Sequence, residues 1–221
     1  MASRIASGDA DPADALMARV ATDGSAAHPY LRDEALSAGP EATRNLADAV
    51  HFLCLLHGRH PGLIDHAFET SLCNASQKWL GATAPAFAAE RAYVTKLAVA
   101  IGPVPSTPGS AESEAAVLGQ RHALEMLARS ERRGCALGAT VALIVDWQAI
   151  RPLLDRAAHR LGLEPDVCRL PTRETIEAIL REVAVDPGTL RALNFGAEQV
   201  LVQHRGLFDL LDARQSARRD S

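Results

Sequence analysis

Aromatic residues are scarce in this chain. Phe, Trp and Tyr together make up 4% of its 221 residues, whereas hydrophobic residues as a whole make up 48%. Leu, Ala, Val and Ile must therefore fill the core, and Ala and Leu are strong helix formers, whereas sheets favour β-branched and aromatic residues. The composition predicts an all-α fold, and a chain of this length is most simply one domain.

Cysteine is also sparse and scattered. Cys54, Cys73, Cys135 and Cys168 are far apart and form no Cys-x-x-Cys pair. This spacing does not predict a disulfide framework, and a reduced, cytoplasmic setting fits it best. Lysine occurs only twice, while arginine and alanine are frequent, which is typical of a GC-rich bacterial genome.

Two further absences exclude classes of partner. The formal net charge is -4, whereas a general nucleic-acid binder is strongly basic. The longest uncharged apolar stretch, residues 134–145, is too short for a membrane span, which needs about 20 residues. The N-terminus has no continuous apolar segment of the kind that a secretory signal needs. We therefore expect no nucleic acid and no membrane as partners; a small-molecule ligand and a homodimer stay open.

Apolar periodicity and helix-capping residues predict a bundle of about seven helices. A helix from about 134 is apolar on all sides until Asp146, which indicates a buried central helix over about 134–150. Gly134, Gly138 and Ala142 form a ridge of small residues on it that would let another helix approach closely. The other long helices are expected at about 40–57, 61–79, 85–101, 110–130, 172–183 and 187–213, with a break at 81–85.

The same reading divides the chain into three parts. Residues 1–27 are rich in Ala, Asp, Ser and Gly and are expected to be mostly disordered or loosely docked, with at most a short helix near 12–21. Residues 28–213 form the single helical domain. Residues 214–221 are expected to be a disordered tail.

Two histidines fall on otherwise apolar helix faces. His57 shares an arc with Leu53 and Leu56, and His204 stands in a row with Val200 and Leu207. A buried imidazole is either a satisfied core group or a ligand. The structural alternatives are a helix-end His57 that bonds a last-turn carbonyl and a core His204 with one hydrogen-bond partner. The functional alternative is a metal ligand, a haem ligand or an acid/base group.

Glu90 also points partly inward, in the row of Phe87 and Val94, and a buried carboxylate must be paired or protonated. Arg91 is the partner nearest in sequence. His57, His204 and Glu90 are the main candidates for an internal pocket, with iron or haem as the cofactors to consider.

Weaker candidates lie on polar helix faces. Glu114, His122 and Glu125 share one flank of their predicted helix. Acid–His pairs three residues apart can bind a metal jointly, and such pairs also arise by chance on polar faces. Three occur here: Asp48–His51, which we expect on the outer side of its helix, His66–Glu69 and His122–Glu125.

The segment Gly58-Arg59-His60-Pro61-Gly62 stands beside a predicted helix N-terminus. Free backbone N–H groups point outward at such an end, so Arg59 and His60 could hold an anion there. The alternative is a solvated turn.

Several long helices with inward histidines resemble the haem-oxygenase and TenA-type architecture. In its di-iron relatives a Glu and a His stand seven apart on one helix, and a His-x-x-x-Asp-x-x-His set lies on another. This chain departs from both patterns, because Arg121 stands seven after Glu114 and Arg44 stands four before Asp48. The segments His28-Pro-Tyr-Leu31, Leu56-His-Gly-Arg-His-Pro-Gly62 and Arg133-Gly-Cys-Ala-Leu-Gly-Ala139 resemble a group of uncharacterised alphaproteobacterial proteins, which implies no known activity.

The sequence thus leaves the function unknown and supports two hypotheses. The first is a cytoplasmic helical protein with an internal ligand or metal pocket, an enzyme of the oxygenase-like kind being one form of it. The second is a non-enzymatic interaction or regulatory module, which predicts a large exposed apolar patch.

Overall fold

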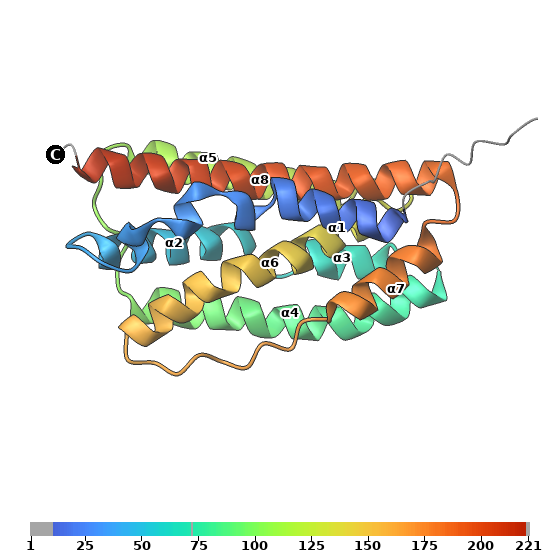
Figure 1. The fold of residues 1–221 in the computed structure, drawn as a ribbon, viewed down its shortest axis with the longest axis horizontal. Coiled ribbons are helices and arrows are strands. Elements are labelled where there is room, and N and C mark those ends of the chain that lie inside the picture. Colours follow the sequence, from blue (N-terminus) through green and yellow to red (C-terminus); the bar gives the residue numbers. More distant parts are fainter. Residues whose placement is uncertain (1–10, 72, 220–221) are drawn as a thin grey trace, which may run out of the picture.

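The computed structural model describes residues 11–71 and 73–219 and shows an all-helical bundle (Figure 1). Three short 3-10 helices, η1 (Ser25–Ala27), η2 (Pro29–Arg32) and η3 (Glu34–Leu36), connect the first two α-helices. The described residues contain no strand. The eight α-helices of this part of the chain are α1 (Pro12–Asp23), α2 (Ala42–His57), α3 (Leu63–Glu69), α4 (Asn74–Ala100), α5 (Ser110–Ala128), α6 (Cys135–Arg160), α7 (Arg173–Val183) and α8 (Pro187–Arg219).

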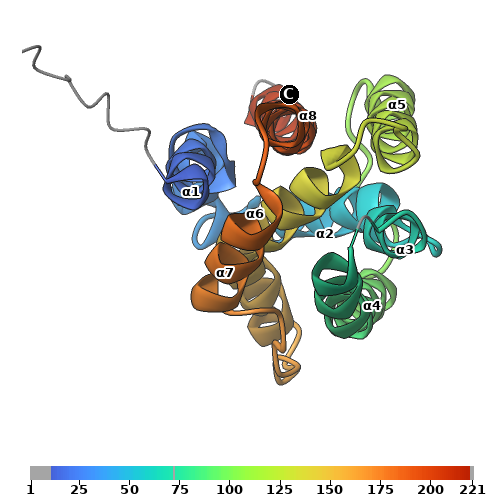
Figure 2. The same ribbon diagram turned by 90° about the vertical axis from the view of Figure 1, so that its right-hand side faces the viewer.

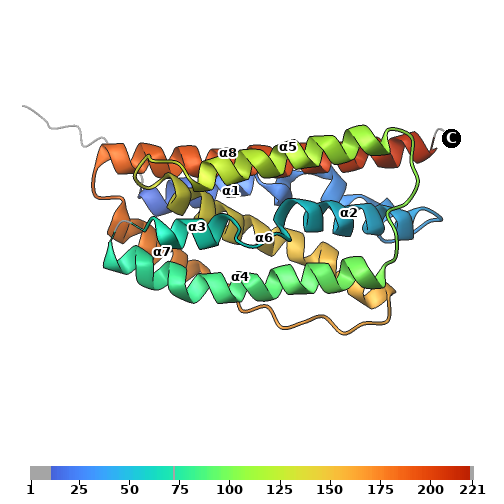
Figure 3. The ribbon, with the colours of Figure 1, turned by 180° about the vertical axis from the view of Figure 1, so that it is seen from behind.

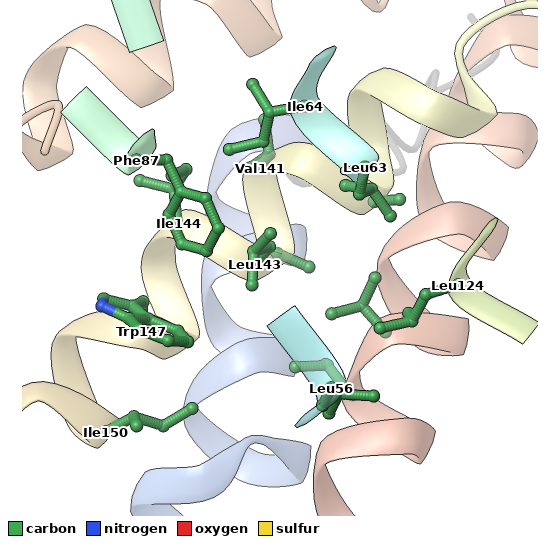
Figure 4. Close-up of a cluster of buried hydrophobic side chains, with 14 of the residues drawn as sticks. Leu56, Leu63, Ile64, Phe87, Leu124, Val141, Leu143, Ile144, Trp147 and Ile150 are labelled. Atoms are coloured by element: carbon green, nitrogen blue, oxygen red, sulfur yellow. The ribbon is translucent and has the colours of Figure 1, made fainter. Parts of the chain in front are cut away.

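The central helix is where the sequence predicts it. α6 runs diagonally through the bundle between α8 and α4, and the other helices surround it in the end-on view (Figures 1 and 2). Residues 135–144 of α6 are buried on every side, and Leu143, Ile144 and Trp147 are fully enclosed (Figure 4). α6 is long and apolar enough to cross a membrane, but 78% of its most apolar window is buried inside the protein, as in the core helix of a soluble protein.

Glycines set the distance between α6 and α8. A Cβ added at Gly138 would lie 2.0 Å from the carbonyl oxygen of Leu193, and one added at Gly196 would lie 2.0 Å from the carbonyl oxygen of Cys135. No side chain fits at either position, so the two backbones pack directly against each other. The predicted ridge of small residues is confirmed, and α8 is the helix that packs on it.

The predicted break at 81–85 is wrong. α4 passes through Gly81 and Pro85 without interruption, and the chain breaks earlier, between α3 and the capping interactions of Cys73 with Ser76. A proline removes one hydrogen bond from a helix. Here the packing of buried neighbours such as Leu80 and Phe87 outweighs that cost.

The chain termini are more ordered than the sequence predicts. Residues 11–27, expected to be mostly disordered, form α1 and η1, and α1 buries Leu16, Met17 and Val20; residues 1–10 lie outside the described part. α8 continues to Arg219, so residues 214–219 are helix rather than a disordered tail. Arg214 and Gln215 are buried there, because the guanidinium of Arg214 pairs with the carboxylate of Asp48.

Candidate functional site

The two inward histidines meet in the core. His57 is the last residue of α2, His204 lies in the middle of α8, and their Nε2 atoms are 2.9 Å apart. The exposed fractions of the two residues are 8% and 0%. His57 therefore bonds another imidazole rather than a last-turn carbonyl. His204 has two partners instead of the single one expected.

Asp146 of α6 completes this cluster. Its Oδ2 lies 2.6 Å from Nδ1 of His204 and 2.5 Å from Oγ of Ser25, and the backbone N–H of Ser25 donates to its Oδ1 at 2.7 Å. A buried carboxylate accepts from N–H and O–H donors, so His204 donates through Nδ1. The chain of contacts Ser25–Asp146–His204–His57, hereafter the histidine network, joins η1, α6, α8 and α2.

The surroundings of His57 keep its ring neutral. The ring meets the rings of Phe87 and Trp147 edge-on, with centroids 6.3 Å and 5.5 Å away. Burial, followed by repulsion from His204 and Arg91, holds the pKa of His57 well below its usual value. The facing Nε2 atoms of His57 and His204 are joined by one hydrogen bond, with a single proton between them.

Glu90 belongs to a second buried network beside the first. The Nε1–H of Trp147 donates to Oε2 of Glu90 at 2.9 Å, and the guanidinium of Arg151 binds both carboxylate oxygens, at 2.7 Å and 2.9 Å. Arg151 also donates to Asp155 at 2.7 Å. The charge partner of Glu90 is thus Arg151 of α6, whereas the neighbouring Arg91 pairs with Asp65.

The structure brings His57, His204 and Glu90 into one region, with Trp147 between the imidazole pair and the carboxylate. Each group is already hydrogen-bonded within the protein. No group of three His, Cys, Asp or Glu side chains among the described residues is placed to hold a metal ion. The described residues therefore offer no set of three donors for an iron ion at this place. The histidine network fixes three segments of the chain, η1, α8 and α2, against α6.

The loop after α2, where the sequence suggested a bound anion, holds the carboxylate of Asp65. Oδ2 of Asp65 accepts from the backbone N–H of Gly62 at 2.8 Å and from Arg91 at 2.9 Å, and it lies 3.2 Å from Nδ1 of His60. Burial raises the pKa of Asp65, but the hydrogen bond from Gly62 and the charge of Arg91 outweigh it and lower this pKa. His60 and the loop backbone are thus already bound to a carboxylate, and Arg59 points elsewhere.

Arg59 lines a pocket on the other side of α2. We call it the α2–α5 pocket. Its volume is about 650 Å³. It lies where the connection from α4 to α5 passes the end of the bundle next to α2 (Figure 3). Its lining residues are His51, Phe52, Cys54, Leu55, Arg59, Val104, Pro105, Ser106, Ser110, Glu114, Arg121 and Arg214.

Two weaker candidates lie at this pocket and one does not. Glu114 lines it. Glu125 stands at its edge, 3.8 Å from the guanidinium of Arg59 and 3.7 Å from that of Arg121. His122 is exposed on α5 and lines none of the cavities described here. Glu114, His122 and Glu125 therefore do not converge on one point.

One buried arginine of the α2–α5 pocket, Arg214, belongs to a cluster of charged side chains. The guanidinium of Arg214 binds both carboxylate oxygens of Asp48, at 2.9 Å and 3.0 Å, and donates to Oγ of Ser110 and the carbonyl of Pro105. Arg218 shares Asp48, at 2.5 Å. Two guanidinium groups thus meet one fully buried carboxylate, which is why Asp48 is not on the outer side of α2.

Sequence reasoning missed Asp146, Arg151, Asp48 and Arg214. Asp146 is the first charge after the apolar run of the central helix, and Arg151 follows within the same helix. A charge embedded in an all-apolar helix must be paired, so the position of Asp146 was an available signal. Asp48 and Arg214 carry no comparable signal, because they lie far apart on faces that also hold polar residues.

Comparison with known proteins gives one match. A family model described as a family of unknown function, DUF6975, matches residues 20–219. No curated protein and no solved structure matches the chain, so the resemblance to haem oxygenase and TenA has no support from these comparisons. The match covers all of α2 to α8 and is consistent with the resemblance to proteins of unknown function. The chain belongs to the DUF6975 family.

Proposed function

We propose that the protein binds a small organic anion, a carboxylate on an apolar body, in the α2–α5 pocket. The observation that carries this proposal is the set of three arginines at one pocket of suitable size. Known small-molecule sites have volumes of roughly 300–1,000 Å³, and the 650 Å³ of this pocket falls inside that range.

The arginines of the pocket keep donors for a ligand. Arg59 and Arg121 stand beyond hydrogen-bond distance of Glu125, and neither guanidinium donates a hydrogen bond within the described part of the chain. Arg214 has five N–H groups, of which four are used. Both arginines share the charge of Glu125 but have no hydrogen-bond acceptor in that part of the chain. The planar fork of a guanidinium fits a carboxylate, so a ligand carboxylate would supply that acceptor.

The rest of the lining is suited to an apolar body. Phe52 and Leu55 of α2 face Val104 and Pro105 of the connection across the pocket. Arg214 lies against the ring of Phe52, with its Cζ 5.1 Å from the ring centroid, so the charged and apolar parts of the lining are continuous there. An apolar chain or ring of the ligand would cover these side chains and lose its contact with water.

This proposal moves the ligand site from the pocket first expected at His57, His204 and Glu90 to the opposite side of α2. The interaction-module hypothesis, which predicts a large exposed apolar patch, has less support. The most exposed large apolar side chains, Val99, Val167 and Val185, lie on α4 and in two separate connections, and such scattered residues are ordinary on a protein surface.

The test is calorimetric titration with octanoate and with its neutral analogue octanamide. We expect octanoate to bind about tenfold or more tightly than octanamide, because only the carboxylate accepts charge-assisted hydrogen bonds. Arg59→Gln and Arg121→Gln should each weaken octanoate binding, while octanamide binding stays the same. Arg169→Gln is the matched control, because Arg169 is exposed and lies outside the pocket. Equal binding of the two compounds, or loss in the control, would overturn the proposal.

A further inference from the structure

Four arginines without an ion-pair partner among the described residues lie together at one end of the molecule. Four others also form no ion pair within residues 11–71 and 73–219 but do not line the hollows at that end: Arg32, Arg156, Arg160 and Arg169. Twelve arginines pair with carboxylates in the described part of the chain. Arg129, Arg132, Arg133 and Arg191 form no ion pair there, and all four are exposed. This is the end at which α7 passes into α8 and α4 begins, and it faces the reader in Figure 2.

These arginines line two adjoining hollows that share Arg132 and Arg133. The larger has a volume of about 930 Å³ and contains Arg191; the smaller has about 170 Å³ and contains Arg129. We call the two together the arginine hollow. Its other lining residues that matter here are Cys73, Ser130, Glu131, Gly134, Glu182, Val183, Val185, Asp186, Ala192 and Phe195.

Positive charge exceeds negative charge in this hollow. Glu131, Glu182 and Asp186 are its carboxylates. Asp186 is already engaged, because both carboxylate oxygens accept hydrogen bonds from the first turn of α8, and these bonds lower its pKa. The four guanidinium groups outnumber the three carboxylates. The hollow thus has one positive charge in excess. The charge of Arg133 contributes to the lowered pKa of Asp186, but no arginine of the hollow forms an ion pair with a described residue.

The beginning of α6 adds to this excess. Gly134 precedes the helix in the left-handed region, with φ of 95°, and no side chain caps the first turn. The uncapped N–H groups of a long helix carry a partial positive charge. Gly134, Ala136 and Leu137 of this turn line the smaller hollow beside Arg129 and Arg133. The charged part of a ligand would lie there.

The larger hollow offers an apolar surface next to those charges. Phe195 is 38% exposed and Val185 79% exposed, and the guanidinium of Arg132 stands over the Phe195 ring with its Cζ 4.9 Å from the centroid. An arginine stacked on an aromatic ring keeps its edge free to donate hydrogen bonds.

We propose that the arginine hollow binds a small phosphate ester, its phosphate among Arg129, Arg132 and Arg133 and its organic part over Phe195 and Val185. A phosphate carries up to two negative charges and three acceptor oxygens, so several guanidinium groups bind it together, whereas a carboxylate satisfies one. The smaller hollow accommodates a group of phosphate size. This site is independent of the α2–α5 pocket and uses none of its residues.

The cysteines provide the test without any engineered label. Cys73 lines the arginine hollow, and hydrogen bonds from the Ser76 hydroxyl and N–H lower its pKa. Cys168 is exposed on the connection before α7, outside both sites, and burial of its thiol raises its pKa. Iodoacetamide reacts with thiolates, so the rate of alkylation at each cysteine, followed by peptide mass spectrometry, reports on its surroundings.

Phenyl phosphate is the probe, at constant ionic strength. We expect it to slow alkylation of Cys73 about threefold or more, because a bound dianion raises the pKa of a nearby thiol and covers it. Cys168 should react at an unchanged rate. Phenol, which lacks the phosphate, should not protect Cys73.

The variant Arg132→Gln/Arg133→Gln should abolish the protection, and Arg169→Gln should keep it. Arg132 and Arg133 are both exposed, so the double substitution should leave the circular dichroism spectrum unchanged. Three results would overturn the proposal: equal slowing at Cys73 and Cys168, protection by phenol, or protection that persists in the double variant.

The same experiment measures the other site separately. Cys54 lines the α2–α5 pocket, so its alkylation rate reports on octanoate binding there.

Discussion

His57 and His204 stand edge to edge in the core, with their Nε2 atoms 2.9 Å apart and their ring planes at 86°. Two imidazoles in this position share one proton between the facing nitrogens, and the other nitrogen of His204 is committed to Asp146. A further proton on His57 would place a positive charge in a buried site beside His204 and Arg91. The pair should make the fold sensitive to acid.

The first prediction is the pH dependence of stability. The pKa of His57 is lowered in the folded protein, so below about pH 6.5, the ordinary value, the unfolded chain binds a proton that the folded chain excludes. The stability that His57 contributes is thus complete above pH 6.5 and is lost as the pH falls below it. Urea denaturation between pH 8 and pH 5 measures this. His57→Gln should flatten the slope, and His122→Gln, at an exposed position, should not. An unchanged slope in His57→Gln would contradict the assignment.

The second prediction concerns the acceptor of the histidine network. Asp146→Ala leaves His204 Nδ1–H and both donors of Ser25 without a partner, and truncation of one member of a buried charged network costs about 3–5 kcal/mol. Ser25→Ala removes a single hydrogen bond and should cost about 1 kcal/mol. The free energies of unfolding from urea titration give both numbers. Equal costs for the two variants would show that Asp146 is not the centre of the network.

The apolar periodicity of a single helix predicts which of its residues point inward. It does not predict which residues of other helices they contact. His57, His204 and Glu90 stand out because each interrupts an apolar row. Asp146 interrupts no such row, because the first part of α6 is buried on all sides and has no polar face. Only its place as the first charge after the apolar run marks it. The pairing of Asp48 with Arg214 is a long-range contact, so neither helix reveals it alone. The same limit explains the wrong break at 81–85, where local propensity favoured an end and packing against the bundle decided otherwise.

The third prediction tests the close approach of α6 and α8. Gly138→Ala places its Cβ 2.0 Å from a backbone oxygen that cannot move alone, so it should cost about 3 kcal/mol, the upper part of the range for overpacked cores. Gly119→Ala in α5 meets no atom within 4 Å and should stabilise the protein by about 0.5–1 kcal/mol. Thermal unfolding followed by circular dichroism should show melting temperatures that move in opposite directions. A neutral Gly138→Ala would mean that the two helices are farther apart.

The fourth prediction compares the removal of one member of the Glu90–Arg151 ion pair with the removal of both. Arg151→Met leaves the carboxylate of Glu90, 2% exposed, with only the Trp147 N–H as donor, and Glu90→Leu leaves Arg151 with the carboxylate of Asp155 and the backbone carbonyl of Asp166. Arg151→Met should cost about 3–5 kcal/mol, because it strands the Glu90 carboxylate in the core, and Glu90→Leu should cost less, because Arg151 keeps its ion pair with Asp155. The double variant Glu90→Leu/Arg151→Met strands no carboxylate, so its cost should be smaller than the sum of the two single costs. Urea titration of the four proteins completes the cycle. Additive costs would show that the two groups do not depend on each other and would contradict the pairing.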